Sequence, residues 1–259
     1  MKEVTIAVPI YLETMSDMER ISFERLRKVL GHYRTVIIKP DSLDLSGLLS
    51  EWPGLETESF DDRFFKGVSG YNSLMMSEEF YSRFQDSEYI LIYQLDAYVF
   101  KDELHYWCSQ GYDYVGAPWI PRMIHRCAVM RLAAWAKKVH CNRTGKPNRH
   151  IVRYKVGNGG FSLRRVDSHL KAVRQLKDTV DRFLASPGHP NFNEDVFFSL
   201  EVNRHGLNFR YPDWKEALRF SFDMHPRACF IYNHRQLPFG CHGWYKKKAR
   251  KFWASFILR

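Results

Sequence analysis

Val4-Thr5-Ile6-Ala7-Val8-Pro9, near the start of a chain of 259 residues, is a run of β-forming residues that stops at a proline. From Asp17 to Leu30 the apolar residues recur at helical spacing, and Gly31 follows them. Thr35-Val36-Ile37-Ile38 then has the composition of a second buried strand. Strand, helix and strand in this order predict the start of a parallel α/β sheet. Such sheets bind ligands beyond the carboxyl ends of their strands.

The rest of the chain continues this alternation. Residues 71–84 have helical apolar spacing, and the next strand, 89–93, delivers Gln94-Leu95-Asp96 to its end. Further core elements are predicted as a short strand at 112–116, a return to the core at 154–163 and a long helix at 167–184. We therefore predict one α/β domain over residues 1–243, with a mixed, mostly parallel central sheet flanked by helices.

Two basic segments depart from this pattern. Residues 122–150 are predicted to be an amphipathic insertion between core elements, and residues 244–259 a basic aromatic C-terminal tail. The tail has five cations between positions 246 and 251, followed by apolar residues. For each segment the choice is between contact with an anionic membrane surface and a helix that packs on the core with a solvated charged face. The membrane interpretation is favoured for the tail.

Composition limits the partners and the compartment. The chain has 39 Lys and Arg against 29 Asp and Glu, a net charge of +10, which favours anionic partners such as nucleotide diphosphates, nucleic acid or acidic lipids. The five cysteines show neither CxxC spacing nor the density of a disulfide scaffold, which indicates a reducing compartment. The N-terminal apolar run is too short to span a membrane and has no signal-peptide pattern, so we expect a cytoplasmic location.

Acidic residues follow predicted elements at two places. Asp96 comes directly after a buried strand, where it is either a turn residue or a group that can hold a metal ion on a diphosphate. Glu194 and Asp195 are at the start of a predicted helix that Asn193 can cap. There the helix dipole favours ionised carboxylates. They are either an ordinary acidic pair at a helix N-terminus or a base for an acceptor hydroxyl.

Glycines and a histidine complete the candidate site. Gly157-Asn158-Gly159-Gly160 lacks the following Gly-Lys-Ser/Thr of a phosphate-binding loop, and glycines in a strand indicate the close approach of another group, here a sugar ring. His242 is either a core histidine, a metal ligand or a phosphate donor.

Six segments in one order, from Tyr71 to Trp244, together resemble GT-A glycosyltransferases, and most closely a bacterial family of transferases found among polysaccharide-synthesis proteins. The segments are Tyr71-Asn72-Ser73-Leu74-Met75, Tyr93-Gln94-Leu95-Asp96-Ala97, Tyr112-Asp113-Tyr114-Val115-Gly116-Ala117-Pro118-Trp119, Val156-Gly157-Asn158-Gly159-Gly160-Phe161-Ser162-Leu163-Arg164, Asn193-Glu194-Asp195-Val196-Phe197-Phe198 and Phe239-Gly240-Cys241-His242-Gly243-Trp244.

The resemblance implies roles for these residues. Asp96 matches the last carboxylate of the Asp-x-Asp motif, which binds a divalent ion, Mn²⁺ or Mg²⁺, while Gln94 replaces the first and leaves a metal-independent mechanism open. His242 matches a C-terminal metal ligand, Asp195 the general base and Glu194 a sugar contact. The remaining assignments are donor binding by Pro9, Tyr11, Lys66, Asn72, Gln94 and Asp96, and acceptor or sugar binding by Trp119, Asn158, Gly159 and Gly160.

The function implied is transfer of a sugar from a nucleotide diphosphate donor, a UDP-sugar, to a hydroxyl of a glycan or lipid-linked acceptor, with inversion. Its setting would be synthesis of a surface polysaccharide, such as capsule or lipopolysaccharide, by a cytoplasmic protein held peripherally at the inner face of the membrane through its tail. The alternatives are a non-catalytic sugar- or nucleotide-binding protein of the same fold and a basic nucleic-acid-binding protein. No nucleic acid is expected under the first interpretation, and a zinc site is the weakest because no Cys or His pair has regular spacing.

Overall fold

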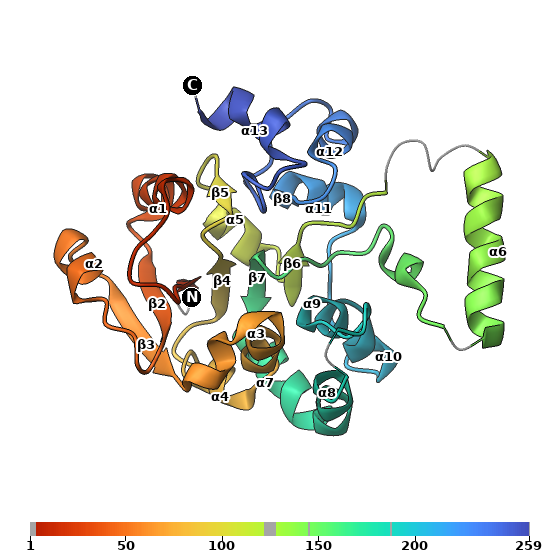
Figure 1. Cartoon of the computed structure of the whole chain (residues 1–259), viewed down its shortest axis with the longest axis horizontal. Coiled ribbons are helices and arrows are strands. Elements are labelled where there is room, and N and C mark those ends of the chain that lie inside the picture. Colours follow the sequence, from red (N-terminus) through yellow and green to blue (C-terminus); the bar gives the residue numbers. More distant parts are fainter. Residues whose placement is uncertain (1–3, 122–127, 145, 187, 259) are drawn as a thin grey trace.

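The computed structural model describes residues 4–121, 128–144, 146–186 and 188–258. Within these ranges the central sheet has six strands in the order β3-β2-β1-β4-β7-β6 (Figure 1). Strands β1 to β4 are parallel, whereas β7 is antiparallel to both β4 and β6. Their bounds are β1 Val4–Pro9, β2 Arg34–Pro40, β3 Glu56–Phe60, β4 Tyr89–Tyr93, β6 Tyr114–Gly116 and β7 Phe161–Arg165. The predicted α/β class with a mixed, mostly parallel sheet is confirmed.

Each face of the sheet has its own hydrophobic core, because successive strand side chains point to opposite faces. In β1, Ala7 faces one core while Ile6 and Val8 face the other. The first core packs against α3 (Gly67–Met75), α4 (Glu78–Ser82), α7 (Val166–Gln175) and α8 (Lys177–Leu184). The second packs against α1 (Asp17–Leu30), α5 (Leu104–Ser109) and α11 (Trp214–Phe220).

Local sequence signals set the helix ends. Ser16 and Glu19 form a reciprocal capping box at the start of α1, which satisfies backbone N–H groups that the first turn leaves free. The helix predicted over residues 71–84 is instead two helices, α3 and α4, because the Ser77 hydroxyl accepts a hydrogen bond from Phe80 N and starts a new helix. The helix predicted over 167–184 is likewise divided into α7 and α8 at Leu176, which has non-helical backbone angles.

A second, smaller sheet lies beside the first. It has the order β5-β9-β8, formed by β5 (Tyr98–Val99), β9 (Gly240–Cys241) and β8 (Ser221–Phe222). Helices α12 (Pro226–Tyr232) and α13 (Arg250–Ile257) pack around it. The other helical segments of the described residues are α2 Ser46–Glu51, η1 Asp62–Phe65, α6 Ala128–Thr144, η3 Arg149–Val152, α9 Glu194–Val196, a π-helical turn Phe197–Glu201 and α10 Val202–Arg204.

Residues 244–258 of the expected basic aromatic tail pack on the protein. Trp244 and Trp253 are completely buried in the core around the small sheet, and the Trp244 indole donates a hydrogen bond of 2.7 Å to Ser22 Oγ in α1. These two large apolar side chains hold the segment against the protein, because burying each removes a large area from water. The lysines between them remain exposed.

The predicted insertion contains α6, which stands apart from the rest of the molecule (Figure 1). Leu132 and Trp135 on this helix are 65% and 62% exposed. Backbone hydrogen bonds close the base of the insertion, from Trp119 N to Lys155 O (3.0 Å) and from Tyr154 N to Trp119 O (3.1 Å). Residues 122–127 and 145 of the insertion lie outside the described residues. No described helix is both long and apolar enough to cross a membrane.

Trp253→Ala should lower the free energy of unfolding by about 3–5 kcal/mol, because it empties a large buried site. Lys251→Ala, at an exposed position two residues earlier, should change it by less than about 0.5 kcal/mol. Chemical denaturation of the two variants measures both values. Equal, small effects would contradict a packed C-terminal segment.

Candidate functional site

Several chain segments meet at the carboxyl ends of β1 and β4. Strand β1 ends at Pro9 and leads to Tyr11, while β4 leads to Gln94 and Asp96. Because β7 runs antiparallel to β4, the glycines that precede β7 lie at this same edge, and Gln94 N donates a hydrogen bond of 2.9 Å to Gly160 O. The fold therefore brings residues far apart in sequence to one place.

A cavity of about 540 Å³ opens at this edge. Ten of the sequence-predicted site residues line it, from both the donor and the acceptor groups: Tyr11, Asn72, Gln94, Asp96, Asn158, Gly159, Gly160, Glu194, Asp195 and His242. Asp96 and Asp195 thus share one cavity.

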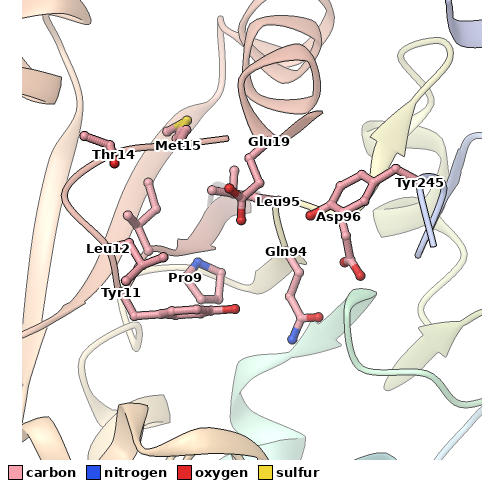
Figure 2. Close-up of a pocket in the computed structure, with 11 residues that line it drawn as sticks. Pro9, Tyr11, Leu12, Thr14, Met15, Glu19, Gln94, Leu95, Asp96 and Tyr245 are labelled. Carbon is pink, nitrogen blue, oxygen red and sulfur yellow. The ribbon is translucent and has the colours of Figure 1, made fainter. Parts of the chain in front are cut away.

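A smaller cavity of about 110 Å³ adjoins the first and shares Tyr11, Gln94 and Asp96 with it. Figure 2 shows Tyr11 on one side of this smaller cavity, Asp96 and Tyr245 on the other, and Gln94 between them. Pro9 lines it as well. The Tyr11 side chain is 56% exposed, which leaves its ring accessible for stacking.

Two predicted residues, Lys66 and Trp119, line neither cavity. Lys66 is exposed at the start of α3. Trp119 lies against Gly157, where an added Cβ would come within 1.8 Å of its ring. The roles predicted for these two residues, donor binding and acceptor binding, therefore have no geometric support from the cavity.

Asp96 is the centre of a charged cluster. His242 Nε2 lies 2.9 Å from Asp96 Oδ1, Lys246 Nζ lies 2.8 Å from Asp96 Oδ2, and His242 Nδ1 lies 3.1 Å from Asp223 Oδ1. Burial opposes ionisation of Asp96, but His242 and Lys246 outweigh it and hold the pKa of this carboxyl well below its usual range. Burial likewise lowers the pKa of His242, but the charges of Asp96 and Asp223 raise it to about 9. At neutral pH the cluster contains an imidazolium.

This cluster does not suit a divalent ion as it is arranged. A metal-bound histidine needs a free nitrogen lone pair, whereas Nε2 of His242 faces Asp96 and Nδ1 faces Asp223. Asp96 Oδ1 makes no hydrogen bond of good geometry, although His242 Nε2 lies near it, and Lys246 is paired with Oδ2. Gln94 contributes no charge. Among the described residues, no three His, Cys, Asp or Glu side chains are placed to hold a metal ion. The expected ligands Asp96 and His242 are brought together, but as an ion pair.

Glu194 is held by a buried ion pair with Arg164. Arg164 Nη2 donates to Glu194 Oε2 at 3.0 Å, and the two side chains are 0% and 5% exposed. Tyr81 and Ser162 accept further hydrogen bonds from the guanidinium of Arg164, at 3.0 and 3.1 Å. Burial raises the pKa of Glu194, although Arg164 opposes this shift.

Asp195 differs from the permanently ionised carboxylate that its helical position suggests. Burial and the neighbouring charge of Glu194 raise the pKa of Asp195 to about 7. The helix dipole does not offset these effects, because α9 has only three residues before the π-helical turn. Such a carboxyl can accept a proton near neutral pH, which is a requirement for a general base.

The start of α9 is held from a distant helix. The sequence predicts that Asn193 caps this helix, and Asn193 does occupy the N-cap position, but its side chain makes no capping hydrogen bond. Instead Asn72 in α3 accepts a hydrogen bond from Glu194 N (3.2 Å) and donates one to Asn193 Oδ1 (3.3 Å). Asn72 therefore fixes the acidic pair on the cavity wall.

Gly159 and Gly160 allow side chains of the protein itself to come close to the backbone. The sequence alone predicts that a sugar ring makes this close approach. A Cβ on Gly159 would lie 1.7 Å from Glu194 Oε1, and one on Gly160 would lie 2.2 Å from His242 Nε2. Glycine at both positions is thus required by the neighbouring charged groups, while the same two residues still face the cavity.

Sequence reasoning did not place Arg164, Asp223, Tyr245 or Lys246 in the site. Lys246 is only four residues after the predicted site residue His242, and this closeness in sequence could have placed it in the site. The run of lysines around it instead favours a surface role. Arg164 ends one of the segments that carry the family resemblance. Asp223 follows a strand of only two residues, Ser221–Phe222, which has no periodicity to reveal it.

A family described as "Protein of unknown function (DUF5672)" matches residues 54–242. The chain belongs to this family. A search of curated proteins finds no match to this DUF5672 sequence.

Several solved structures with a similar fold are glycosyltransferases. They include the galactosyltransferase LgtC in complex with donor and acceptor sugar analogues, at a TM-score of 0.56 and 11% identity, covering 98% of this chain and 94% of that one. Mouse xyloside xylosyltransferase 1 in its apo form has a TM-score of 0.53 and 14% identity, covering 92% and 96%. The glycosyltransferase GlyE of Streptococcus pneumoniae TIGR4 has a TM-score of 0.53 and 12% identity, covering 99% and 60%. This DUF5672 chain therefore has the GT-A glycosyltransferase fold.

Gly159→Ala should lower the free energy of unfolding by about 1–3 kcal/mol, because the new methyl group displaces a buried carboxylate from its arginine. Gly47→Ala is the matched control, since a Cβ there meets nothing within 4 Å in α2. It should raise stability by about 0.5–1 kcal/mol, as expected for a helical glycine. If Gly159→Ala proves as stable as Gly47→Ala, the Glu194 contact is not rigid.

Proposed function

We propose that the protein is a glycosyltransferase that moves a sugar from a nucleotide diphosphate donor, a UDP-sugar, to a hydroxyl of a glycan or lipid-linked acceptor. The observation that carries the proposal is that Asp96 and Asp195 line one cavity at the carboxyl ends of parallel strands in a GT-A fold. Ligands of α/β proteins bind at this edge. The similar fold of known sugar transferases supports the same assignment.

The donor would lie across the two adjoining cavities. Its base stacks on Tyr11 near Pro9, in the smaller cavity, and its diphosphate lies beside the Asp96 cluster, where the two cavities meet. The transferred sugar then faces Gly159, Gly160 and Asn158 in the larger cavity. Asn158 Oδ1 is buried without a hydrogen-bond partner, so a sugar hydroxyl there would satisfy it.

Asp195 is the proposed base of an inverting displacement. The acceptor oxygen attacks the anomeric carbon while the bond from that carbon to the diphosphate oxygen breaks, and the acceptor proton passes to Asp195. Glu194, which Arg164 fixes beside it, contacts the sugar. Because the pKa of Asp195 is about 7, the carboxylate is a stronger base than an exposed aspartate.

A non-catalytic sugar- or nucleotide-binding protein of the same fold is the second candidate. The uncharged Gln94 beside Asp96 favours it, since the usual first carboxylate of the motif is missing. Hydrolysis of a UDP-sugar by the purified protein separates the two candidates, because a binding protein leaves the sugar–phosphate bond intact.

Asp195→Asn should abolish transfer while UDP binding is kept, because the amide is isosteric with the acid but cannot accept the acceptor proton. Asp178→Asn, at an exposed position in α8, is the control and should leave transfer unchanged. UDP affinity and product formation are measured for both variants, and NMR of the product gives its anomeric configuration. Turnover near that of the wild type in Asp195→Asn, or a product with retained configuration, would contradict the assignment.

The same assignment fixes the pH dependence. A base with a raised pKa is active only when deprotonated, so kcat/KM of the wild type should rise with pH through about 7 and then level off. Glu194 titrates together with Asp195, so the rise belongs to the pair. A rate that falls as pH increases from 6 to 8 would exclude Asp195 as the base.

We further propose that the C-terminal segment holds the protein at the inner face of the cell membrane, where a lipid-linked acceptor for a surface polysaccharide, such as capsule or lipopolysaccharide, would be found. Phe256 and Leu258 are 36% and 43% exposed, and Lys247, Lys248 and Lys251 are exposed near them. Exposed apolar residues next to cations are suited to an anionic lipid surface.

Replacing Lys247, Lys248 and Lys251 by glutamine should weaken binding to vesicles with acidic lipids on the order of 100-fold, since each cation contributes about 1 kcal/mol. The matched control replaces three other exposed lysines by glutamine and so lowers the net charge equally. These are Lys28 on α1, Lys171 on α7 and Lys177 on α8. Vesicle sedimentation with and without acidic lipid measures both. Equal losses in the two triple variants would point to net charge and against a membrane-binding segment.

A further inference from the structure

Lys246 is a cation in the wall of the large cavity, beside the residues proposed to hold the diphosphate. Its ammonium lies 2.8 Å from Asp96 Oδ2, and its side chain is 59% exposed. A lysine ammonium has three donor hydrogens, so the contact with one carboxylate oxygen leaves two for another ligand. The ammonium is therefore both anchored and accessible from the cavity.

The backbone around Lys246 holds it in place. Gly243 has a left-handed φ of 65° and starts a turn in which Lys246 N donates to Gly243 O at 3.1 Å. Lys246 O in turn accepts hydrogen bonds from Ala249 N (2.8 Å) and Arg250 N (2.9 Å) at the start of α13. Trp244 N donates to Asp96 O at 3.1 Å, which joins this turn to the end of β4. Lys246 and Asp96 thus belong to one hydrogen-bonded unit.

Both carboxylate oxygens of Asp96 already lie against side chains of the chain. Oδ2 is 2.8 Å from Lys246 Nζ, and Oδ1 is 2.9 Å from His242 Nε2. Gln94, which lines the cavity beside them, is uncharged and adds no second carboxylate. A diphosphate that enters the cavity next to Asp96 meets the ammonium of Lys246 at the place where its charge must be balanced.

We propose that Lys246 balances the charge of the donor diphosphate directly, so that the nucleotide binds and the sugar is transferred without a divalent ion. This inference rests on the proposed glycosyltransferase function. As the bond between the anomeric carbon and the diphosphate oxygen breaks, its electron pair goes to that oxygen, and the ammonium stabilises the developing charge. Asp96 then acts as a positioning residue, which fixes Lys246 by ion pairing.

Titration calorimetry of UDP in EDTA tests the proposal with the full chain. The affinity for UDP measured in buffer with EDTA should lie within about twofold of the affinity measured in buffer with Mn²⁺ and no EDTA. Lys246→Met should weaken this binding at least ~10-fold, the loss expected for a charge-assisted hydrogen bond. Lys246→Arg, which keeps the charge, should recover most of it. Lys171→Met, at an exposed position in α7, should bind UDP as the wild type does. Thermal unfolding of all four proteins checks that Lys246→Met remains folded.

The outcomes separate this inference from the function on which it rests. UDP binding that needs Mn²⁺, or an equal affinity in Lys246→Met and Lys171→Met, overturns the role of Lys246 and leaves the glycosyltransferase proposal standing. Failure of UDP, GDP, CDP and dTDP to bind with or without Mn²⁺ overturns both.

Discussion

The buried ion pair between Arg164 and Glu194 joins two parts of the cavity wall, the central sheet and the acidic segment at the start of α9. Arg164 is in β7, and Glu194 starts α9, so this one contact connects the central sheet to the segment that carries Asp195. Two charges removed from water are stable only when each is fully paired and hydrogen-bonded, and removing one partner of such a pair costs about 3–5 kcal/mol. Tyr81, Ser162 and the Gly159 carbonyl complete the coordination of the arginine. The glycines and the acidic pair are thereby positioned by the same group.

This arrangement also accounts for the difference between two aspartates in one cavity. Asp96 is surrounded by cations and stays ionised, whereas Asp195 lies beside another carboxylate and takes up a proton near neutral pH. A site with one permanently charged group and one titrating group can separate charge balance from proton transfer. The local sequence does not show the first property, because the fold brings Lys246 to Asp96. It shows Glu194 next to Asp195, but it does not show the burial that is the larger cause of the raised pKa of Asp195.

The sequence predicts the parts of the fold that have long periodic elements. Largely apolar runs form the centres of the strands Val4–Pro9, Arg34–Pro40 and Tyr89–Tyr93, because a parallel strand is buried on both faces. The six segments of the family resemblance likewise identify most of the residues that line the cavity. The small sheet escapes prediction, since its two-residue strands have no measurable period. The packing of the C-terminal segment escapes it too, because a lysine-rich run looks solvent-exposed until Trp244 and Trp253 are seen to be buried.

The closed base of the insertion separates two parts of the chain that can change independently. Backbone hydrogen bonds between Trp119, Tyr154 and Lys155, together with the bridge between Pro118 and Val156, fix the spacing at which the chain leaves the sheet and returns to it. A change in the length or sequence of the segment between them would leave the register of β6 and β7 in place. What α6 contacts can therefore change without moving Gly159 and Gly160.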